Sequence, residues 1–346
     1  MTIKNLLPGV QKNILLKNYT TFKIGGPAKY FYIAKAKTDL IEAIKKAKKL
    51  NPSPFPKGDR VKLPFFILGG GSNLLVSDKG FNGLVIKFGR PLSWYVSKGL
   101  EWAAGIPGTI QGAVYGNSGA FGKSMKDVVE SVEVFDTKTE KIKIFKNKDC
   151  RFSYRNSIFR KKKNLIILSV KIKSKKVDEL RSSPRSANAR VVDELRSSPR
   201  FAAARVVDEL RSSPRFAAAR VSNVKKIKQY LDYKKQTQPL NFPSAGSIFK
   251  NFTPHRNKIS GAGPNELKEL KKFQKTGMIP AARLIEECGL KGKKIGNVKI
   301  SEKHGNFIVN LDGGKAKDVI KLIKLTKKKV KNKFKVNLEE EIQYLP

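Results

Sequence analysis

The chain is poor in several features that define whole classes of protein. Its 346 residues include only two cysteines, Cys150 and Cys288, which are far apart and show no CxxC spacing. This scarcity argues against a disulfide framework or a zinc site and predicts two buried thiols. No run of about 18 apolar residues occurs, so we expect no membrane span. The opening MTIKNLLPGVQKN lacks the apolar block of a secretory signal, and we therefore expect a cytoplasmic protein.

Acidic residues are scarce as well. Only 28 Asp and Glu stand against 72 Lys and Arg, which gives a formal net charge of +44. Such an excess is compatible with nucleic-acid binding, and a basic nucleic-acid-associated protein is one alternative. The lysines, however, are spread over nearly every segment, and no zinc-finger spacing, RNP-like aromatic motif or basic heptad accompanies them. We favour a general preference for anionic ligands, with an affinity that falls as salt rises.

The apolar pattern predicts helices and strands in mixed order. Helical spacing is found at 39–50 and 318–334, and the runs 128–135 and 141–145 flank a turn and predict a hairpin. Further strand-like runs are at 63–68, 165–173 and 336–345. No regular βαβ series is seen, and the order therefore predicts an α+β protein.

Residues 177–221 are a repeat with a period of 15: VDELRSSPRSANARV is followed twice by VDELRSSPRFAAARV. A solenoid unit usually has about 20 residues or more and must stack to bury a face. These units are shorter and carry a proline in the middle. We therefore expect a tolerated insertion, looped out between a strand and a helix, because loop-closure entropy grows slowly with length. A repeat that binds a partner is the alternative.

Two glycine-rich segments favour a nucleotide cofactor. GGGSN (69–73) follows a predicted strand, and GIPGTIQGAVYGNSGAFG (105–122) holds six glycines. Glycines let the main chain approach a ligand closely and direct N–H groups at phosphates. Neither segment has P-loop or GxGxxG spacing, so a plain glycine turn is the alternative for the first. The second is expected to make a poor helix and to wrap a flat or diphosphate-bearing cofactor.

Three shorter motifs carry side chains suited to catalysis or to ligand binding. RFSYRNSIF (151–159) places an arginine among apolar residues, which is costly unless it meets an anion or a structural carboxylate. PSAGSIFKN (243–251) sets the hydroxyl of Ser247 on a glycine hinge before an apolar pair. In NLEEEI (337–342), alternate glutamates would share one face of a strand.

Together these stretches resemble the UDP-N-acetylenolpyruvoylglucosamine reductase family. The resemblance covers most of the chain outside the repeat, and LEEEI is similar to the family's closing LEPEV. It is carried by NYTTFKIGGPA, LGGGSNLLVSD, LEWAAGIPGTIQGAV, NSGAFG, YRNSIF, QPLNFPSAGSIFKN, LIEECGLKGKKIG and SEKHGNFIVN. It implies an α+β protein with an FAD-binding domain of the vanillyl-alcohol-oxidase (PCMH) type and a C-terminal α+β substrate domain. The expected boundaries are 1–176 for the FAD domain, 177–221 for the insertion and 222–346 for the substrate domain.

The resemblance also implies the reaction. Family members use NADPH and FAD to reduce UDP-N-acetylglucosamine enolpyruvate, a UDP-sugar, to UDP-N-acetylmuramate for the bacterial cell wall. We expect a monomer. Matched by motif, Arg155 is the catalytic arginine, Ser247 the proton donor and Glu341 the catalytic glutamate. Residues implied for the substrate are Tyr154, Lys235 and Asn251. Those implied for FAD are Gly69, Gly70, Gly71, Ser72, Asn73, Gly105, Ile106, Pro107, Gly108, Gly112, Asn117, Gly119 and Ala120.

The chemistry of these residues suits such a reaction. Negative charge develops next to the substrate carboxylate, and fixed donors aimed at that charge lower the barrier. Arg155 can hold the carboxylate in a bidentate way, and a protonated Glu341 can hydrogen-bond it. Ser247, on a turn of small residues, can approach closely enough to protonate the carbon.

Three features depart from the family pattern. The FAD part is shortened near 88–98, where the family has a strand and an AGAG-like turn, and this predicts a weaker sheet or weaker FAD binding. Gln111 stands where the family usually has glycine, so we expect a shift of the backbone. Residues 254–279 are longer than in compact members and predict an added loop and short helix. An inactive relative and another oxidase of the same flavin superfamily are therefore kept as alternatives.

Overall fold

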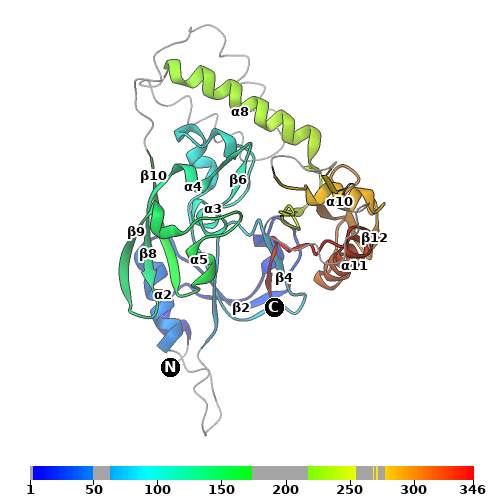
Figure 1. Ribbon diagram of the computed structural model, residues 1–346. Coiled ribbons are helices and arrows are strands. Elements are labelled where there is room, and N and C mark those ends of the chain that lie inside the picture. Colours follow the sequence, from blue (N-terminus) through cyan, green and yellow to red (C-terminus); the bar gives the residue numbers. More distant parts are fainter. Residues whose placement is uncertain (1–2, 50–62, 174–216, 255–267, 269, 272–276) are drawn as a thin grey trace. The chain divides into compact units, whose positions relative to one another are not determined.

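The computed structural model describes residues 3–49, 63–173, 217–254, 268, 270–271 and 277–346. The chain forms two compact units (Figure 1). The first unit comprises Met1–Ile33, Lys46–Ile86 and Thr237–Pro346, and the second comprises Ala34–Lys45 and Lys87–Gln236. Helices and strands alternate irregularly, so the expected α+β class is confirmed. Most of the repeat (177–216) and most of the longer segment 254–279 lie outside the described residues, and the predicted domain boundaries stay a prediction.

The N-terminal part of the first unit is a small sheet. Strand β2 (Pro27–Ile33) turns Ala28 and Phe31 inward, as the alternation of a half-buried strand requires. The sheet has the order β1-β2-β5-β3, with β1 (Gln11–Leu15), β5 (Phe81–Lys87) and β3 (Phe65–Leu68). Beside it, β4 (Leu74–Val76) pairs in parallel with β15 (Gln343–Leu345), so the end of the chain joins its beginning.

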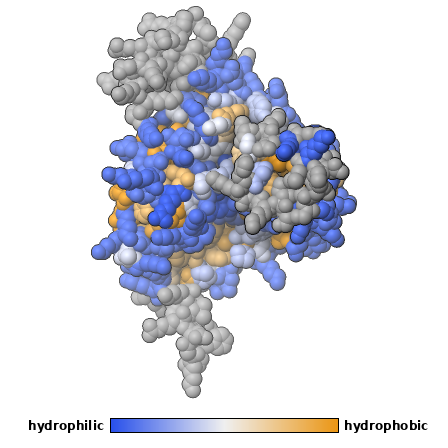
Figure 2. All heavy atoms as spheres, in the orientation of Figure 1, coloured by the Kyte–Doolittle hydropathy of each residue, from blue (hydrophilic) through white to orange (hydrophobic). Residues whose placement is uncertain are grey.

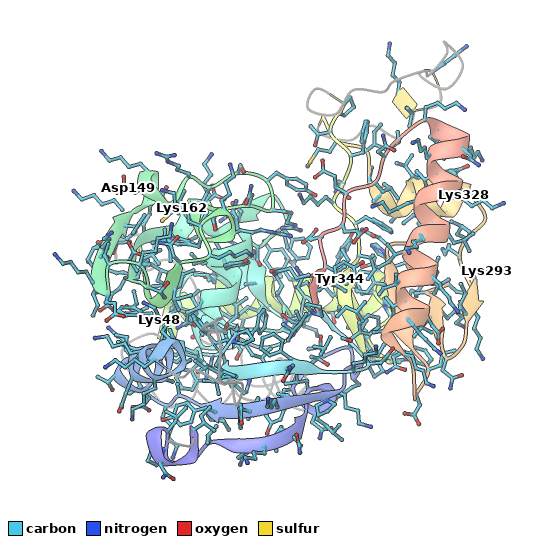
Figure 3. All side chains as sticks on the ribbon, turned by 90° about the horizontal axis from the view of Figure 1, so that it is seen from below. Lys48, Asp149, Lys162, Lys293, Lys328 and Tyr344 are labelled. Atoms are coloured by element: carbon cyan, nitrogen blue, oxygen red, sulfur yellow. The ribbon has the colours of Figure 1, made fainter. Side chains whose placement is uncertain are left out.

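The C-terminal part of the first unit is a second sheet with two helices. Its strands have the order β11-β14-β13-β12, namely β11 (Ser244–Ser247), β14 (Phe307–Asn310), β13 (Val298–Ile300) and β12 (Lys294–Ile295). The helices are α10 (Ala281–Glu287) and α11 (Ala316–Phe334), and α11 confirms the predicted helix at 318–334. Its apolar stripe is buried, whereas Lys328 projects from the exposed face (Figure 3).

The second unit is built on a three-stranded antiparallel sheet. Strand β8 (Val129–Asp136) lies between β10 (Leu165–Ile172) and β9 (Lys141–Lys146), which confirms the predicted hairpin. Its other elements are α3 (Ile110–Gly116), β6 (Gly119–Ala120), β7 (Lys123–Ser124), α4 (Met125–Val128), α5 (Ile158–Lys161) and α8 (Ala217–Thr237). Helix α2 (Lys37–Lys49) confirms the helix predicted at 39–50 and crosses the division between the units.

Short elements complete the described chain. They are α1 (Ile3–Leu6) and the 3-10 helices η1 (Leu16–Tyr19), η2 (Leu92–Lys98), η3 (Glu101–Ala103) and η4 (Asn147–Cys150). Hydrophilic residues cover most of the face seen in Figure 2, as the charge excess leads one to expect. Both cysteines are free thiols; Cys150 is buried, and Cys288 is only partly buried, which corrects the prediction for that residue. Within the described ranges, no helix is long and apolar enough to cross a membrane.

Candidate active site

Ser247 ends strand β11 at an irregularity in the sheet. The pairing of β11 with β14 shifts register between Ser244 and Ser247, so the strand bulges there. Gly246 has a φ of +77°, and a Cβ on it would meet nothing within 4 Å. The glycine is therefore required by its left-handed backbone rather than by lack of space. Ser247 is half-buried, and among the described residues its hydroxyl has no hydrogen-bond partner, which leaves the group available to a ligand.

Asn306, which the sequence did not single out, fixes the residues that follow Ser247. Its buried side-chain Oδ1 accepts from the Phe249 N–H at 2.9 Å, and its Nδ2 donates to the Phe249 carbonyl at 2.8 Å. Its main-chain carbonyl accepts from the Ile248 N–H at 2.9 Å. Three hydrogen bonds to two consecutive residues hold the backbone next to the serine. The only sequence signal was a polar residue directly before an apolar strand.

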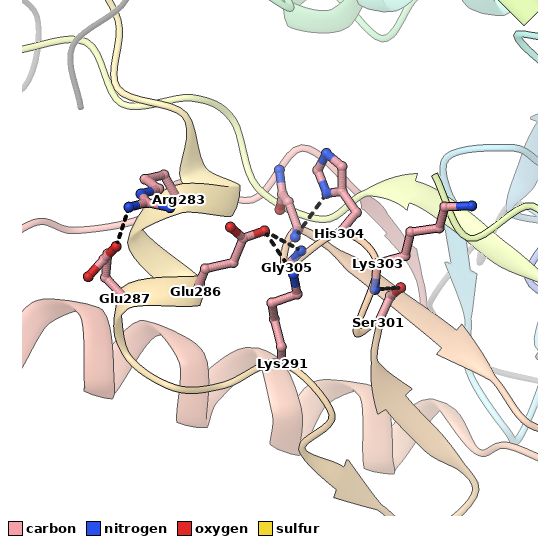
Figure 4. A network of polar contacts seen from close by, with 9 residues as sticks. Arg283, Glu286, Glu287, Lys291, Ser301, Lys303, His304 and Gly305 are labelled. Atoms are coloured by element: carbon pink, nitrogen blue, oxygen red, sulfur yellow. Dashed lines mark hydrogen bonds and ion pairs between the residues drawn. The ribbon is translucent and has the colours of Figure 1, made fainter. Parts of the chain in front are cut away.

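A polar network holds Asn306 in turn (Figure 4). The His304 Nδ1 accepts from the Asn306 N–H at 3.2 Å, and the Glu286 Oε1 accepts from the Gly305 N–H at 3.2 Å. Burial lowers the pKa of His304 below its usual 6.5, and Lys291 acts in the same direction while Glu286 opposes it. Because Nδ1 accepts a hydrogen bond only in the neutral imidazole, the lowered pKa preserves this contact.

Glu341 lies against the same backbone. Its N–H donates to the Ile248 carbonyl at 2.8 Å, and its own carbonyl accepts from the Asn73 Nδ2 at 3.0 Å. The Gln343 N–H donates to the Asn73 carbonyl at 3.1 Å. The first unit thus gathers two predicted catalytic residues, Ser247 and Glu341, and one predicted cofactor residue, Asn73, from distant parts of the sequence.

Other polar side chains of the segments 243–251 and 337–342 have partners within the protein. Lys250 Nζ forms a 2.9 Å ion pair with Glu339, and Lys327 Nζ forms one of the same length with Glu340. A carboxylate from the closing segment thus neutralises the Lys250 ammonium in this structure. The Asn251 Oδ1 accepts from the N–H of Ala281 at 3.2 Å, at the start of α10. The predicted strand at 336–345 is confined to β15, with one isolated bridge at Glu340.

The first glycine segment is a turn between β3 and β4. Gly71 is buried with a φ of +61°, and a Cβ on it would lie 2.2 Å from the Tyr19 carbonyl oxygen. Its carbonyl accepts from the Thr21 N–H at 3.2 Å. Protein packing alone therefore requires this glycine. The neighbouring predicted cofactor residues Gly69, Gly70 and Ser72 are half-buried in the same turn.

Arg155 belongs to the second unit. It has a φ of +52° in a turn closed by the bridge between Ser153 and Asn156. Its Nη1 donates to the Gly119 carbonyl at 3.1 Å, and its guanidinium carbon lies 5.5 Å from the centre of the Tyr154 ring. The predicted arginine thus contacts the second glycine segment directly.

Asn117 ties that segment to the arginine turn. It ends α3 with a φ of +45°, where Asn is favoured after Gly. Its Nδ2 donates to the Ser153 carbonyl at 2.8 Å, and its Oδ1 accepts from the Lys126 N–H at 2.9 Å. The predicted cofactor residue therefore uses both ends of its amide within the protein.

The expectation that 105–122 makes a poor helix is wrong in its centre. Residues Ile110–Gly116 form α3, whose N-cap Thr109 accepts from the Gly112 N–H through its hydroxyl at 3.2 Å. The cap and the burial of Ile110 and Val114 outweigh the low helix propensity of glycine. The turns on either side remain irregular, with Gly105 and Gly108 at positive φ before the helix and Phe121 and Gly122 at positive φ after it.

Gln111 reaches into the protein around the shortened region. Its Oε1 accepts from the Arg90 N–H at 3.1 Å, and its Nε2 donates to the Leu168 carbonyl at 3.3 Å. Gln111 thus connects the short link after β5 with strand β10. The predicted backbone shift at this position stays a prediction.

The two lysines Lys234 and Lys235, near the end of α8, differ in their exposure. Lys235, the predicted substrate contact, is exposed, whereas Lys234 is buried and its Nζ donates to the Ala104 carbonyl. Burial lowers the pKa of Lys234 from 10.5 to about 8. Within the described chain, no carboxylate lies at ion-pair distance from it. Helical spacing from the buried Ile227 places Lys234 on the inner face of α8, a signal that the sequence contained.

Comparisons with known proteins agree with one another. A family model described as "UDP-N-acetylenolpyruvoylglucosamine reductase, C-terminal domain" matches residues 238–345. The UDP-N-acetylenolpyruvoylglucosamine reductase of Caldicellulosiruptor bescii is 34% identical and aligns with 100% of this chain and 93% of its own. That of Bacillus subtilis is 31% identical and aligns with 97% and 94%. The crystal structure of the UDP-N-acetylenolpyruvylglucosamine reductase from Thermus caldophilus matches with a TM-score of 0.62 and 27% identity, covering 97% of this chain and 99% of that one.

Proposed function

Because the chain belongs to the UDP-N-acetylenolpyruvoylglucosamine reductase family, we propose that it reduces UDP-N-acetylglucosamine enolpyruvate to UDP-N-acetylmuramate in peptidoglycan precursor synthesis. The observation that carries the proposal is the likeness to curated reductases over nearly the whole of both chains. We further propose NADPH as electron donor, FAD as cofactor held by a domain of the vanillyl-alcohol-oxidase type, and a cytoplasmic monomer as the working form.

One feature of the second unit suits an anionic cofactor. The Lys234 ammonium is buried beside the Gly105 turn without a counter-ion among the described residues. A buried, unpaired cation is costly, so a ligand that carries a diphosphate would stabilise this region. We propose that the main chains of the segments 69–73 and 105–120 hold FAD. When bound, FAD supplies the two-electron relay between NADPH and the substrate's double bond.

The chain's own residues handle charge and protons. We propose that the planar guanidinium of Arg155 binds the substrate carboxylate, next to which negative charge develops. A protonated Glu341 donates a hydrogen bond to the same carboxylate. Ser247 then transfers the proton of its hydroxyl to the adjacent carbon, for which its lack of a described partner and its place after the left-handed Gly246 are suited. Further substrate contacts are proposed for Tyr154, Lys235 and Asn251.

A flavin spectrum and a turnover assay test the proposal. The purified chain, loaded with FAD, should show the visible flavin absorbance, lose it on anaerobic addition of NADPH and regain it on addition of the enolpyruvyl UDP-sugar. A chain that cannot be loaded with FAD and retains nucleic acid in a salt-sensitive way would favour the nucleic-acid-associated alternative. A chain that is bleached by NADPH but never reoxidised by the substrate would be an inactive relative.

Substitution of Ser247 tests the proton-transfer role. Ser247→Ala should still bind FAD and be reduced by NADPH, but product formation should fall by about 10²- to 10⁴-fold, because a general acid is lost. The matched control is Ser244→Ala on the same strand, which should form product at the wild-type rate. Normal turnover by Ser247→Ala would contradict the assignment.

A further inference from the structure

The hairpin of β6 and β7 has an unusual turn. Its two loop residues, Phe121 and Gly122, have φ values of +52° and +74°. Positive φ at both central positions is the geometry of a type I′ turn, for which Asn-Gly is the favoured sequence. An aromatic residue is strained in the left-handed region. A contact from outside the turn must therefore hold Phe121 in this conformation.

Helix α8 supplies that contact. The Phe121 ring stacks on the Tyr230 ring with centroids 4.2 Å apart and an interplanar angle of 26°. The Tyr233 ring meets it edge-on at 5.5 Å, and Lys234 Nζ lies 5.8 Å from its centre. Phe121 nevertheless remains 38% exposed. Specific ring contacts with α8, rather than full burial, thus account for its position.

The same helix also meets the start of the glycine segment. Gly105 has a φ of +69°, and a Cβ on it would lie 2.9 Å from the Leu231 Cδ2. The neighbouring Ala104 carbonyl accepts from Lys234 Nζ. Because Tyr230 and Leu231 precede Lys234 by four and three positions, all three side chains lie on one face of the helix. This face holds both ends of the segment 105–122.

The base of the hairpin is hydrogen-bonded to Arg155. Gly119, in β6, accepts the 3.1 Å hydrogen bond from Arg155 Nη1. Phe121 is two residues further on, at the tip that α8 holds. A displacement of the tip would thus move the carbonyl that orients the guanidinium.

We propose that Phe121 is a positioning residue, whose contact with α8 holds the 119–124 hairpin and thereby orients Arg155 for the substrate carboxylate. The proposal rests on the proposed reductase function. It adds a residue that touches no reacting atom and acts through Gly119 and Arg155.

Phe121→Asn is the informative substitution, because it improves the turn while it removes the ring. The temperature of unfolding should stay equal or rise, since Asn-Gly suits a type I′ turn. The KM for the enolpyruvyl substrate should rise by about 10-fold or more as the guanidinium loses its position, whereas the KM for NADPH should not change. Amide hydrogen exchange at 119–124 should become faster. Phe121→Tyr, which keeps the stacking, should show the wild-type KM for the enolpyruvyl substrate and wild-type exchange at 119–124.

Glu140→Asn is the matched control. Glu140 also has a left-handed φ, +55°, in the turn between β8 and β9, where it forms an ion pair with Lys45 on α2. Its replacement should likewise leave or raise the unfolding temperature, with unchanged KM values and unchanged exchange at 119–124. The control thus shows that relief of backbone strain, without loss of a contact to α8, is expected to leave the KM values unchanged.

The exchange measurement is made without flavin or substrate, so it separates the two proposals. A wild-type chain without reductase activity would overturn the proposed function and, with it, the catalytic part of this inference. Amide exchange at 119–124 would still report whether the contact between Phe121 and α8 holds the hairpin. Phe121→Asn with wild-type exchange and wild-type KM would overturn the inference alone. If that variant does not fold, Tyr230→Leu removes the stacking partner and leaves the turn intact. Unchanged exchange at 119–124 and unchanged KM in Tyr230→Leu would overturn it equally.

Discussion

The N–H of Glu341 donates a 2.8 Å hydrogen bond to the carbonyl of Ile248, the residue directly after Ser247. The spacing of these two catalytic candidates is thus set by main-chain geometry within one compact unit. On the other side of Ser247, the strand bulges at the left-handed Gly246. Changes that leave both side chains intact but disturb this backbone should therefore affect the reaction.

Asn306→Ala is expected to disturb the backbone next to Ser247. The substitution leaves the buried N–H and carbonyl of Phe249 without their partners, which should lower the free energy of unfolding by about 2–4 kcal/mol. Product formation should fall further than the loss of folded protein accounts for. Urea unfolding and a turnover assay on the folded fraction measure the two effects. Stability and rate close to wild type would show that Asn306 does not anchor the Ser247 backbone.

His304 should make stability depend on pH. Its pKa is lowered in the folded state, so the unfolded chain binds more protons as the pH falls below about 6.5. In the folded chain the imidazole stays neutral, and accepts from the Asn306 N–H, down to its lowered pKa, so stability should be lost as the pH falls from about 6.5 through the folded-state pKa. Urea unfolding of the wild type and of His304→Gln between pH 5 and 8 measures the difference. Parallel pH profiles for the two proteins would contradict this role.

Lys234 should produce the corresponding effect at alkaline pH. Its folded-state pKa of about 8 lies below the ordinary 10.5, so the unfolded chain binds more protons between these values. The free energy of unfolding should therefore rise with pH across this window, because the cost of the buried charge disappears. Lys234→Met should remove that rise, and Lys235→Met, at the exposed neighbour, should retain it. A rise of equal size in Lys234→Met would refute the assignment to this residue.

Gln111→Ala tests how the shortened region is supported. The loss of the hydrogen bonds to Arg90 and Leu168 should lower the free energy of unfolding by about 1–3 kcal/mol. Gln11→Ala, at an exposed position in β1, should change it by less than about 0.5 kcal/mol. Thermal unfolding of the three proteins provides the comparison. A neutral effect of Gln111→Ala would mean that the short link is held without this side chain.

Features with a local physical cause could be predicted from the sequence. The stripe of apolar residues in α11 and the hairpin of β8 and β9 follow from local sequence patterns, and both were predicted near their observed bounds. The sequence also predicted that Gly246 forms a hinge before Ser247. The helix α3 was missed, because its cap and its buried contacts outweigh the low propensity of its glycines.

The sequence by itself determined the kinds of groups that the chain offers: a serine after a glycine, an arginine among apolar residues, closing glutamates and two glycine-rich segments. Only the tertiary structure decided their partners. Asn73 meets Glu341, Asn306 holds Phe249, and Glu339 neutralises Lys250. The reason is physical: backbone conformation responds to near neighbours in sequence, whereas hydrogen bonds and ion pairs depend on which distant segments the packed core brings together.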